Sequence, residues 1–139
     1  MTDPDSWPAA RRQAATEHAA AQRRARSAET ERARAIVARF VSAATGARLP
    51  AERLRARAQA GRATYRTPLR GWYLHTDGRL AVGTDGEFYL LSVPASLRAR
   101  LFGTTVAAHD PPLQVGRSAG DGESIPLAEL LQRRLDAGR

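Results

Sequence analysis

The chain has 139 residues, a formal net charge of +8 and no cysteine. This length suits one domain with an appendage, and the lack of cysteine excludes disulfides and thiolate metal sites and suits a reducing compartment. No run of about 18 apolar residues predicts a membrane span, and the acidic, polar start of the chain does not resemble a secretory signal. We therefore expect a cytoplasmic protein.

The basic residues are all arginine, 22 in number, and the chain contains neither lysine nor asparagine. Amino acids with AT-rich codons are thus avoided, which indicates a bacterium with a GC-rich genome. The choice of arginine over lysine therefore carries no functional argument by itself. The net charge of +8, in contrast, does carry a functional argument.

The charge is concentrated in the first half of the chain. Residues 1–70 hold 15 arginines against 6 acidic residues, a net of +9, whereas residues 71–139 have a net charge of −1. Such asymmetry predicts a basic arm that meets an anionic surface. Nucleic acid, an acidic protein and anionic lipid are all candidate partners.

A long helix is predicted over residues 8–44, where no Pro interrupts after Pro8 and helix-forming residues dominate. Ser6 is its expected cap and Gly46 its expected end. Residues 8–30 lack large apolar side chains, so residues 1–30 are predicted to be a basic arm, either helical or disordered. Residues 33–44 show apolar residues at helical spacing and should pack onto a single small domain, residues 31–139.

A second, short helix is predicted over residues 51–60, between Pro50 and Gly61. Residues 62–70 are interpreted as an arginine-rich connector. From Gly71 onward the pattern becomes typical of strands.

Three antiparallel strands are predicted at 72–75, 79–82 and 87–93, because two Thr-Asp-Gly turns separate them. The third is apolar on both faces and is expected to be central. A helical turn at 95–101, a fourth strand at 104–108 and a long loop at 109–124 should follow.

Pro126 should begin a last helix whose leucine stripe packs on the sheet. The expected fold class is therefore α+β: a long N-terminal and a short second helix, a three- or four-stranded meander and a closing C-terminal helix. The predicted core is Ile36, Phe40, Leu54, Trp72, Leu74, Val82, Phe88, Leu90, Leu127, Leu130, Leu131 and Leu135.

The connector combines cations with aromatic rings. Arg62, Arg66 and Arg70 recur every four residues beside Tyr65, and Trp72 and Tyr73 follow. Guanidinium groups bind phosphates and aromatic rings stack on bases, so this pattern favours nucleic acid. In the structural alternative, the rings belong to the core and the arginines are solvated.

Arginines of the long helix continue its core-facing stripe. At 100° per residue, they lie on the same side as Val37 and Phe40. Aligned charges suggest a binding face, although a solvated helix or a disordered tail remains the alternative. These arginines are Arg12, Arg23, Arg26 and Arg34.

Helices at 33–44 and 51–60 would also allow a helix-turn-helix, which would present Arg53, Arg57 and Arg55 to a DNA groove. The lack of a third helix speaks against it.

The sequence offers no catalytic constellation. No two histidines are spaced as ligands on one element, and no nucleophile motif surrounds any serine. The glycines of segment 116–122 lack the strand, helix and lysine of a phosphate loop. We expect no enzyme, cofactor or metal, and an enzymatic site would have to involve the 109–124 loop.

The leading hypothesis is a non-enzymatic binding module that docks its arm and connector on nucleic acid or a ribonucleoprotein. The alternative is a protein–protein adaptor whose helical arm binds an acidic partner or self-associates. The steep salt dependence of phosphate binding distinguishes the two.

Overall fold

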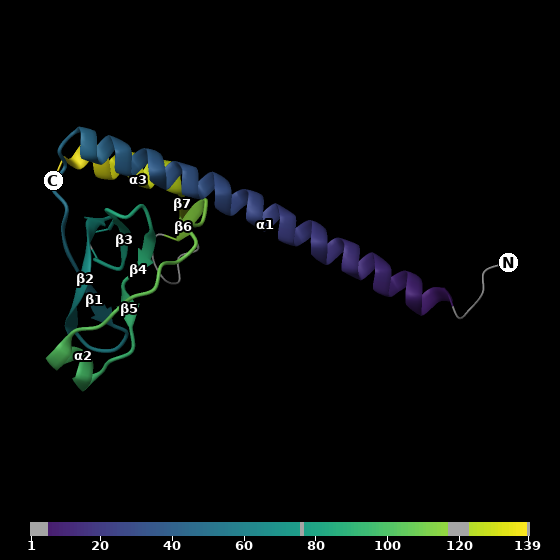
Figure 1. The fold of residues 1–139 in the computed structure, drawn as a ribbon, viewed down its shortest axis with the longest axis horizontal. Coiled ribbons are helices and arrows are strands. Elements are labelled where there is room, and N and C mark those ends of the chain that lie inside the picture. Colours follow the sequence, from purple (N-terminus) through teal and green to yellow (C-terminus); the bar gives the residue numbers. More distant parts are fainter. Residues whose placement is uncertain (1–5, 76, 117–122, 139) are drawn as a thin grey trace.

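The computed structural model describes residues 6–75, 77–116 and 123–138, and it confirms the α+β class. Helix α1 (Ser6–Gly46) runs along one side of a small sheet domain and continues far beyond it (Figure 1). The first part of α1 is exposed. The last part packs on the domain, where it buries Ala33, Val37, Phe40 and Ala44. Helix α3 (Leu127–Ala137) lies beside this packed part of α1.

A five-stranded sheet, with the order β4-β3-β2-β1-β5, forms the rest of the domain. Neighbouring strands are antiparallel, except that β1 and β5 are parallel. The sheet is thus mixed and larger than the three- or four-stranded meander predicted. Its strands are β1 (Glu52–Ala58), β2 (Thr64–Tyr73), β3 (Leu80–Gly83), β4 (Phe88–Leu90) and β5 (Ser92–Val93).

One continuous segment, residues 88–93, supplies the strands at both ends of this order, β4 and β5. Its first half pairs with β3 and its second half with β1. Between the halves, the Leu91 N–H donates to the Arg79 carbonyl at 2.7 Å, and the Leu91 carbonyl accepts from the Arg57 N–H at 2.6 Å. The sheet therefore closes on itself around Leu91, which is fully buried together with Leu54 and Ala81.

The predicted helix over 51–60 is wrong, because this segment is strand β1. Leu54, Ala56 and Ala58 are buried, and the arginines between them are exposed. This alternation has the period of a strand with one buried face. The helix-turn-helix hypothesis is excluded with the helix, since a DNA-reading second helix is absent from this segment.

The predicted connector over 62–70 is also wrong, because most of it belongs to β2. The register between β1 and β2 shifts between Arg53 and Arg55, and Pro68 lies in the extra length of β2, a position where a strand tolerates proline. The buried Thr67 hydroxyl bridges this irregularity: it donates to the Leu54 carbonyl at 2.5 Å and accepts from the Leu69 N–H.

The third predicted strand is divided into β4 and β5, which stand at the two ends of the strand order, so it is not a single central strand but has β3 on one side and β1 on the other. Both faces of β4 are covered. Phe88 packs in the cluster that lies between the sheet and helices α1 and α3, and Tyr89 packs with Leu91 on the other face. Leu90 was wrongly assigned to the core and is 42% exposed.

Residues 104–108 form no strand, and the chain contributes instead an isolated bridge between His109 and Phe88. The predicted loop 109–124 contains strand β6 (Gln114–Gly116), which pairs with β7 (Ser124–Pro126) at the end of the loop to form a two-stranded sheet. Most of the glycine-rich segment considered as a phosphate loop, residues 117–122, lies outside the described residues. Helix α2 (Leu97–Phe102) corresponds to the predicted turn at 95–101.

The main core lies between the helices and the sheet, as predicted. Phe40 meets Trp72 edge-on with ring centroids 5.6 Å apart, and the Trp72 indole N–H donates to the Leu49 carbonyl at 3.0 Å. Leu127, Leu130 and Leu131 of α3 join this cluster, and Ile36 and Leu135 pack at its margin. The Arg134 guanidinium donates to the Tyr73 carbonyl, and burial lowers its pKa.

Candidate nucleic-acid interface

Strands β1 and β2 place arginines directly opposite one another. Arg53 pairs with Arg70, and Arg55 pairs with Arg66. Directly opposed residues of an antiparallel pair share a face, with Cβ atoms about 4.5–5.5 Å apart, and like charges there are destabilising. With Arg57, which is exposed on the same side of β1, these residues form what we call the arginine face: Arg53, Arg55, Arg57, Arg66 and Arg70.

Backbone and hydroxyl oxygens, not carboxylates, hold several of these side chains. The Arg55 guanidinium donates to Thr64 at 3.0 Å, Arg66 donates to the Leu101 carbonyl, and Arg70 donates to the Ala51 carbonyl, both at 3.1 Å. Within the described residues, none of the five forms an ion pair. The like charges are therefore held side by side without an ion pair to a carboxylate of the described residues.

Few acidic residues lie near the arginine face: Glu52 directly precedes Arg53 in β1, and Asp77 lines a pocket together with Arg55 and Arg57. Segments 53–75 and 88–109 hold eight arginines and neither aspartate nor glutamate. The fold brings these segments together, because β5 pairs with β1 and α2 contacts β2. A groove of about 940 Å³ between β2 and α2 is lined by Arg53, Arg66, Arg98 and Phe102, among others. This end of the molecule therefore offers positive charge in a concave, partly apolar surface.

The structure brings some of the predicted site residues together and separates others. Arg53, Arg57, Arg66 and Arg70 belong to the arginine face, and Arg62 is exposed between β1 and β2. Arg12, Arg23 and Arg26 are exposed on the free part of α1, which extends away from β1 and β2 (Figure 1). The chain therefore has two separate arginine-rich surfaces.

Tyr65 cannot act as the predicted stacking ring, because it is only 3% exposed. Its hydroxyl accepts a hydrogen bond from the Ser96 N–H at 3.0 Å, which ties β2 to the start of α2. Sequence reasoning missed Arg98, Arg100 and Phe102 of α2. The absence of acidic residues from 88–109 was the available signal for this basic segment.

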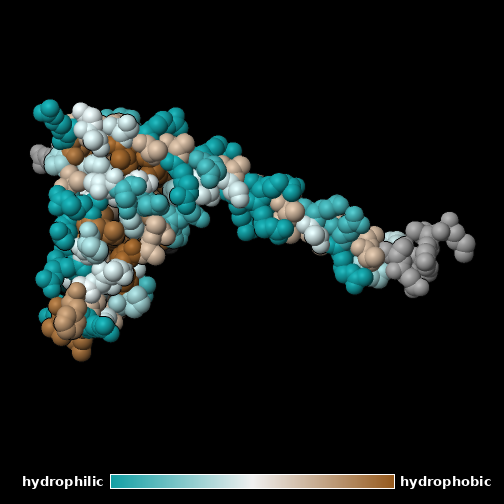
Figure 2. Space-filling view, viewed as in Figure 1, coloured by the Kyte–Doolittle hydropathy of each residue, from teal (hydrophilic) through white to brown (hydrophobic). Residues whose placement is uncertain are grey.

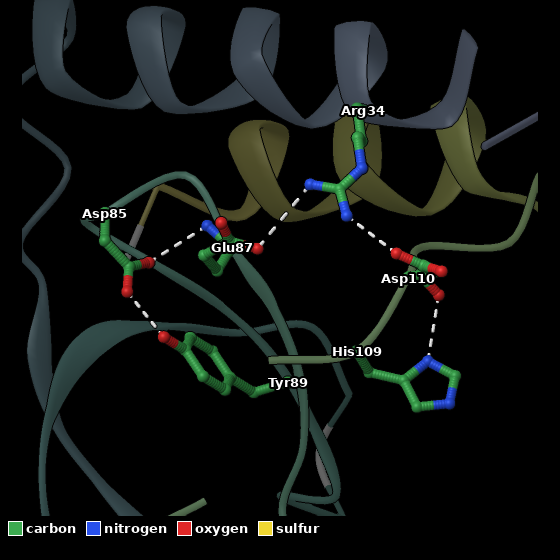
Figure 3. A network of polar contacts seen from close by, with 6 residues as sticks. All are labelled: Arg34, Asp85, Glu87, Tyr89, His109 and Asp110. Atoms are coloured by element: carbon green, nitrogen blue, oxygen red, sulfur yellow. Dashed lines mark hydrogen bonds and ion pairs between the residues drawn. The ribbon is translucent and has the colours of Figure 1, made fainter. Parts of the chain in front are cut away.

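Arg34 lies on the core side of α1, as its phase predicted, but two carboxylates engage it. Its guanidinium is 2.6 Å from Asp110 Oδ1 and 3.8 Å from Glu87 Oε2 (Figure 3). All three side chains are well exposed, so these ion pairs contribute little to stability. They do position α1 over the turn between β3 and β4, and they leave Arg34 less available to an anionic partner than Arg12, Arg23 or Arg26.

The neighbouring turn places the exposed Asp85 against the buried Tyr89 of β4. The Tyr89 hydroxyl donates to Asp85 Oδ2 at 2.5 Å, and Asp85 Oδ1 accepts from the Glu87 N–H at 2.9 Å (Figure 3). Burial, followed by the hydrogen bond and the negative charge of Asp85, raises the pKa of Tyr89. The folded protein thus keeps this phenolic proton at a pH where a free tyrosine loses it.

We expect Tyr89 to make the protein less stable above about pH 10, where tyrosine in the unfolded chain ionises. Because the folded state then binds one more proton than the unfolded state, the free energy of unfolding should fall by up to about 1.4 kcal/mol per pH unit. Urea unfolding between about pH 8 and pH 11 measures this slope. Tyr89→Phe should show a shallower fall, and equal slopes for the two proteins would contradict the assignment.

No family model, curated protein or solved structure matches this chain. The candidate interface therefore rests on the geometry of the chain itself. Among the described helices, none is long and apolar enough to cross a bilayer. Across residues 6–75, 77–116 and 123–138, no three His, Asp or Glu side chains are grouped so that they could hold a metal ion.

Proposed function

We propose that the protein is a non-enzymatic module of the bacterial cytoplasm that binds nucleic acid or a ribonucleoprotein through the arginine face. The cross-strand pairs Arg53–Arg70 and Arg55–Arg66 carry this proposal. Like charges held opposite each other are unfavourable in the free protein, and none of the five arginines forms an ion pair with a carboxylate of the described residues. An anionic partner would turn this repulsion into attraction.

Phosphate is the anion that suits the face best. Guanidinium groups bind phosphate oxygens through paired N–H donors, and several of them in a row can follow a sugar–phosphate backbone. Backbone contacts of this kind position a protein without selecting a sequence. We therefore propose binding of low sequence specificity, with affinity that decreases steeply as salt increases.

The free part of α1 would add a second set of phosphate contacts. Arg12, Arg23 and Arg26 are exposed there, so no described element covers them. Because this part extends away from the arginine face (Figure 1), it would reach a different stretch of the same nucleic acid or another component of a ribonucleoprotein.

A charge-reducing variant of the arginine face tests the proposal. Arg53, Arg57 and Arg70 are exposed, so changing all three to Gln should preserve folding. We expect affinity for RNA and duplex DNA to fall at least about tenfold at low salt, and the log–log salt slope to decrease by about one for each lost phosphate contact. Titration of labelled oligonucleotides at several salt concentrations provides both quantities.

A matched control removes the same charge elsewhere. Arg39, Arg79 and Arg133 are exposed and lie outside the arginine face. Their triple change to Gln should affect binding much less. If both triple variants bind equally, the net charge and not the arginine face determines affinity. If the parent binds neither RNA nor duplex DNA at about 50 mM salt, the proposal fails.

The free helix supports a second candidate, a protein–protein adaptor. An isolated helix normally gains most of its stability from packing, yet the first part of α1 is exposed and its main helix partner among the described elements, α3, lies beside the packed end. The arm would then bind an acidic partner or associate with the arm of a second copy. Sedimentation equilibrium tests self-association, and binding that survives nuclease treatment and high salt would favour the adaptor.

A further inference from the structure

Helix α2 turns its large apolar side chains toward solvent. Ala99 faces the protein and is 8% exposed, whereas Leu97, Leu101 and Phe102 are 79%, 68% and 78% exposed. A surface helix usually shows the reverse arrangement, with its large apolar residues in the core. Three adjacent exposed residues of this kind form an apolar patch, a feature that marks binding sites on otherwise polar surfaces. We call Leu97, Leu101 and Phe102 the apolar tip.

The exposure of the tip does not come from a poorly anchored helix. The Ser96 hydroxyl caps α2 by accepting from the Ala99 N–H at 3.2 Å, and the Gly103 N–H donates to the Ala99 carbonyl at 2.8 Å. Arg66 of β2 donates to the Leu101 carbonyl, and the Thr104 N–H donates to the Arg66 carbonyl at 2.8 Å. The helix is thus fixed at both ends with its apolar side chains outward.

Positive charge surrounds the tip. Arg98 and Arg100 are exposed on α2 itself, and Arg53 and Arg66 line the adjoining groove. The nearest acidic residues along the chain are Glu87 and Asp110, which lie outside the acid-free segment. Figure 2 shows the apolar surface at one extreme of the molecule, on the side opposite the long helix, where it forms a protruding end.

We propose that the apolar tip inserts into the interface of an anionic lipid bilayer, with Arg98 and Arg100 contacting the lipid phosphates. Protruding Leu and Phe side chains beside arginines suit the boundary between acyl chains and headgroups. Anionic headgroups attract clustered arginines and add to the hydrophobic contribution. The tip is too small for a typical stable protein interface, whereas a bilayer surface requires no minimum matching area.

The two other obvious occupants fit less well. A second copy of the chain would bring Arg98 and Arg100 against their own equivalents, which places like charges in the contact. A nucleic acid would satisfy the arginines, and its bases would stack on Phe102, but it offers nothing equivalent for Leu97 and Leu101. The lipid proposal is independent of the proposed nucleic-acid binding, because it relies on the apolar side chains of α2.

Cosedimentation with vesicles provides the first test. We use the full chain with phosphatidylcholine vesicles, pure or containing about one third phosphatidylglycerol. The parent should bind the anionic vesicles preferentially, and Leu101→Gln with Phe102→Gln should weaken this binding at least about tenfold. Both side chains are exposed, so the double variant should remain folded. Leu90→Gln, which changes another exposed apolar residue, is the matched control and should bind like the parent.

The charge contribution is tested by Arg98→Gln with Arg100→Gln, which should reduce the preference for phosphatidylglycerol. The proposal is overturned if the parent does not bind anionic vesicles, or if it binds neutral vesicles equally well. It is also overturned if the tip variant binds like the parent, because attraction would then be purely electrostatic. Oligonucleotide binding by the tip variant, measured in parallel, shows separately whether the arginine face functions.

A fluorescent residue at the tip gives a direct readout of insertion. Phe102→Trp in a Trp7→Phe background leaves Trp72 as the other indole, and Trp72 is buried. Emission should shift to shorter wavelength on adding phosphatidylglycerol vesicles and should be quenched by brominated acyl chains. An unchanged spectrum on vesicles that bind the protein would contradict the proposal, because the tip would then remain in water.

Discussion

Replacing Phe88 with alanine should lower the free energy of unfolding by about 3–5 kcal/mol. Phe88 is 2% exposed and packs in the cluster that joins the helices to the sheet. Its removal therefore loses a large buried apolar area and leaves a cavity between layers that several elements hold in place. The Phe88 carbonyl also accepts from the His109 N–H, so the backbone has limited freedom to collapse into the space.

Urea unfolding of the variant measures this loss, and a residue of the same strand provides the control. Leu90 is two positions further along β4 and partly exposed, so Leu90→Ala should cost clearly less than Phe88→Ala. A loss below about 1 kcal/mol for Phe88→Ala would show that the helices do not pack on β4 as described.

A single methyl group at Gly71 should also destabilise the protein severely, by about 3 kcal/mol or more. A Cβ atom there would lie 2.1 Å from the Val82 carbonyl oxygen and 2.8 Å from the Gly83 Cα. Both atoms belong to the backbone of β3, so no side-chain rotation can relieve the clash. Gly71→Ala would thus force β2 and β3 apart beside the buried Trp72.

Gly46 provides the matched control for this change. It ends α1, and a Cβ atom at this position would meet nothing within 4 Å. Gly46→Ala should therefore change stability by no more than about 0.5 kcal/mol. Thermal or urea unfolding of both variants makes the comparison. Similar stabilities for Gly71→Ala and the parent would show that β2 and β3 are not as close as the structure places them.

The sequence predicted elements where local signals and tertiary context agree. Helix α1 follows from uninterrupted helix formers, and α3 follows from its leucine stripe and Pro126. The Asp-Gly pairs at 77–78 and 85–86 correctly marked the boundaries of β3, and Gly78 and Gly86 have the positive φ that such turns need.

The error at β1 has a physical cause. Glu, Arg, Leu and Ala all favour helices, so propensity outweighed the strict alternation of Arg53, Leu54, Arg55, Ala56 and Arg57. Pairing with β2 and β5 overrides this preference in the folded chain. Such pairing involves residues distant in sequence, which a local pattern does not contain.

The same limit applies to the candidate interface. The spacing of Arg62, Arg66 and Arg70 indicated a basic surface, but the opposed pairs with Arg53 and Arg55 depend on register and on the irregularity around Thr67. Tyr65 was misassigned for a related reason. Its place in β2 puts the ring on the buried side, and only the strand assignment reveals that side.

The length of α1 affects how the molecule moves through solution. At 1.5 Å per residue its 41 residues span about 60 Å, whereas a compact chain of this size has a radius of gyration of about 14 Å. The monomer should therefore diffuse slowly for its mass of 15.1 kDa and elute early from a gel-filtration column. An elution volume calibrated on compact proteins would thus suggest an oligomer even where none exists.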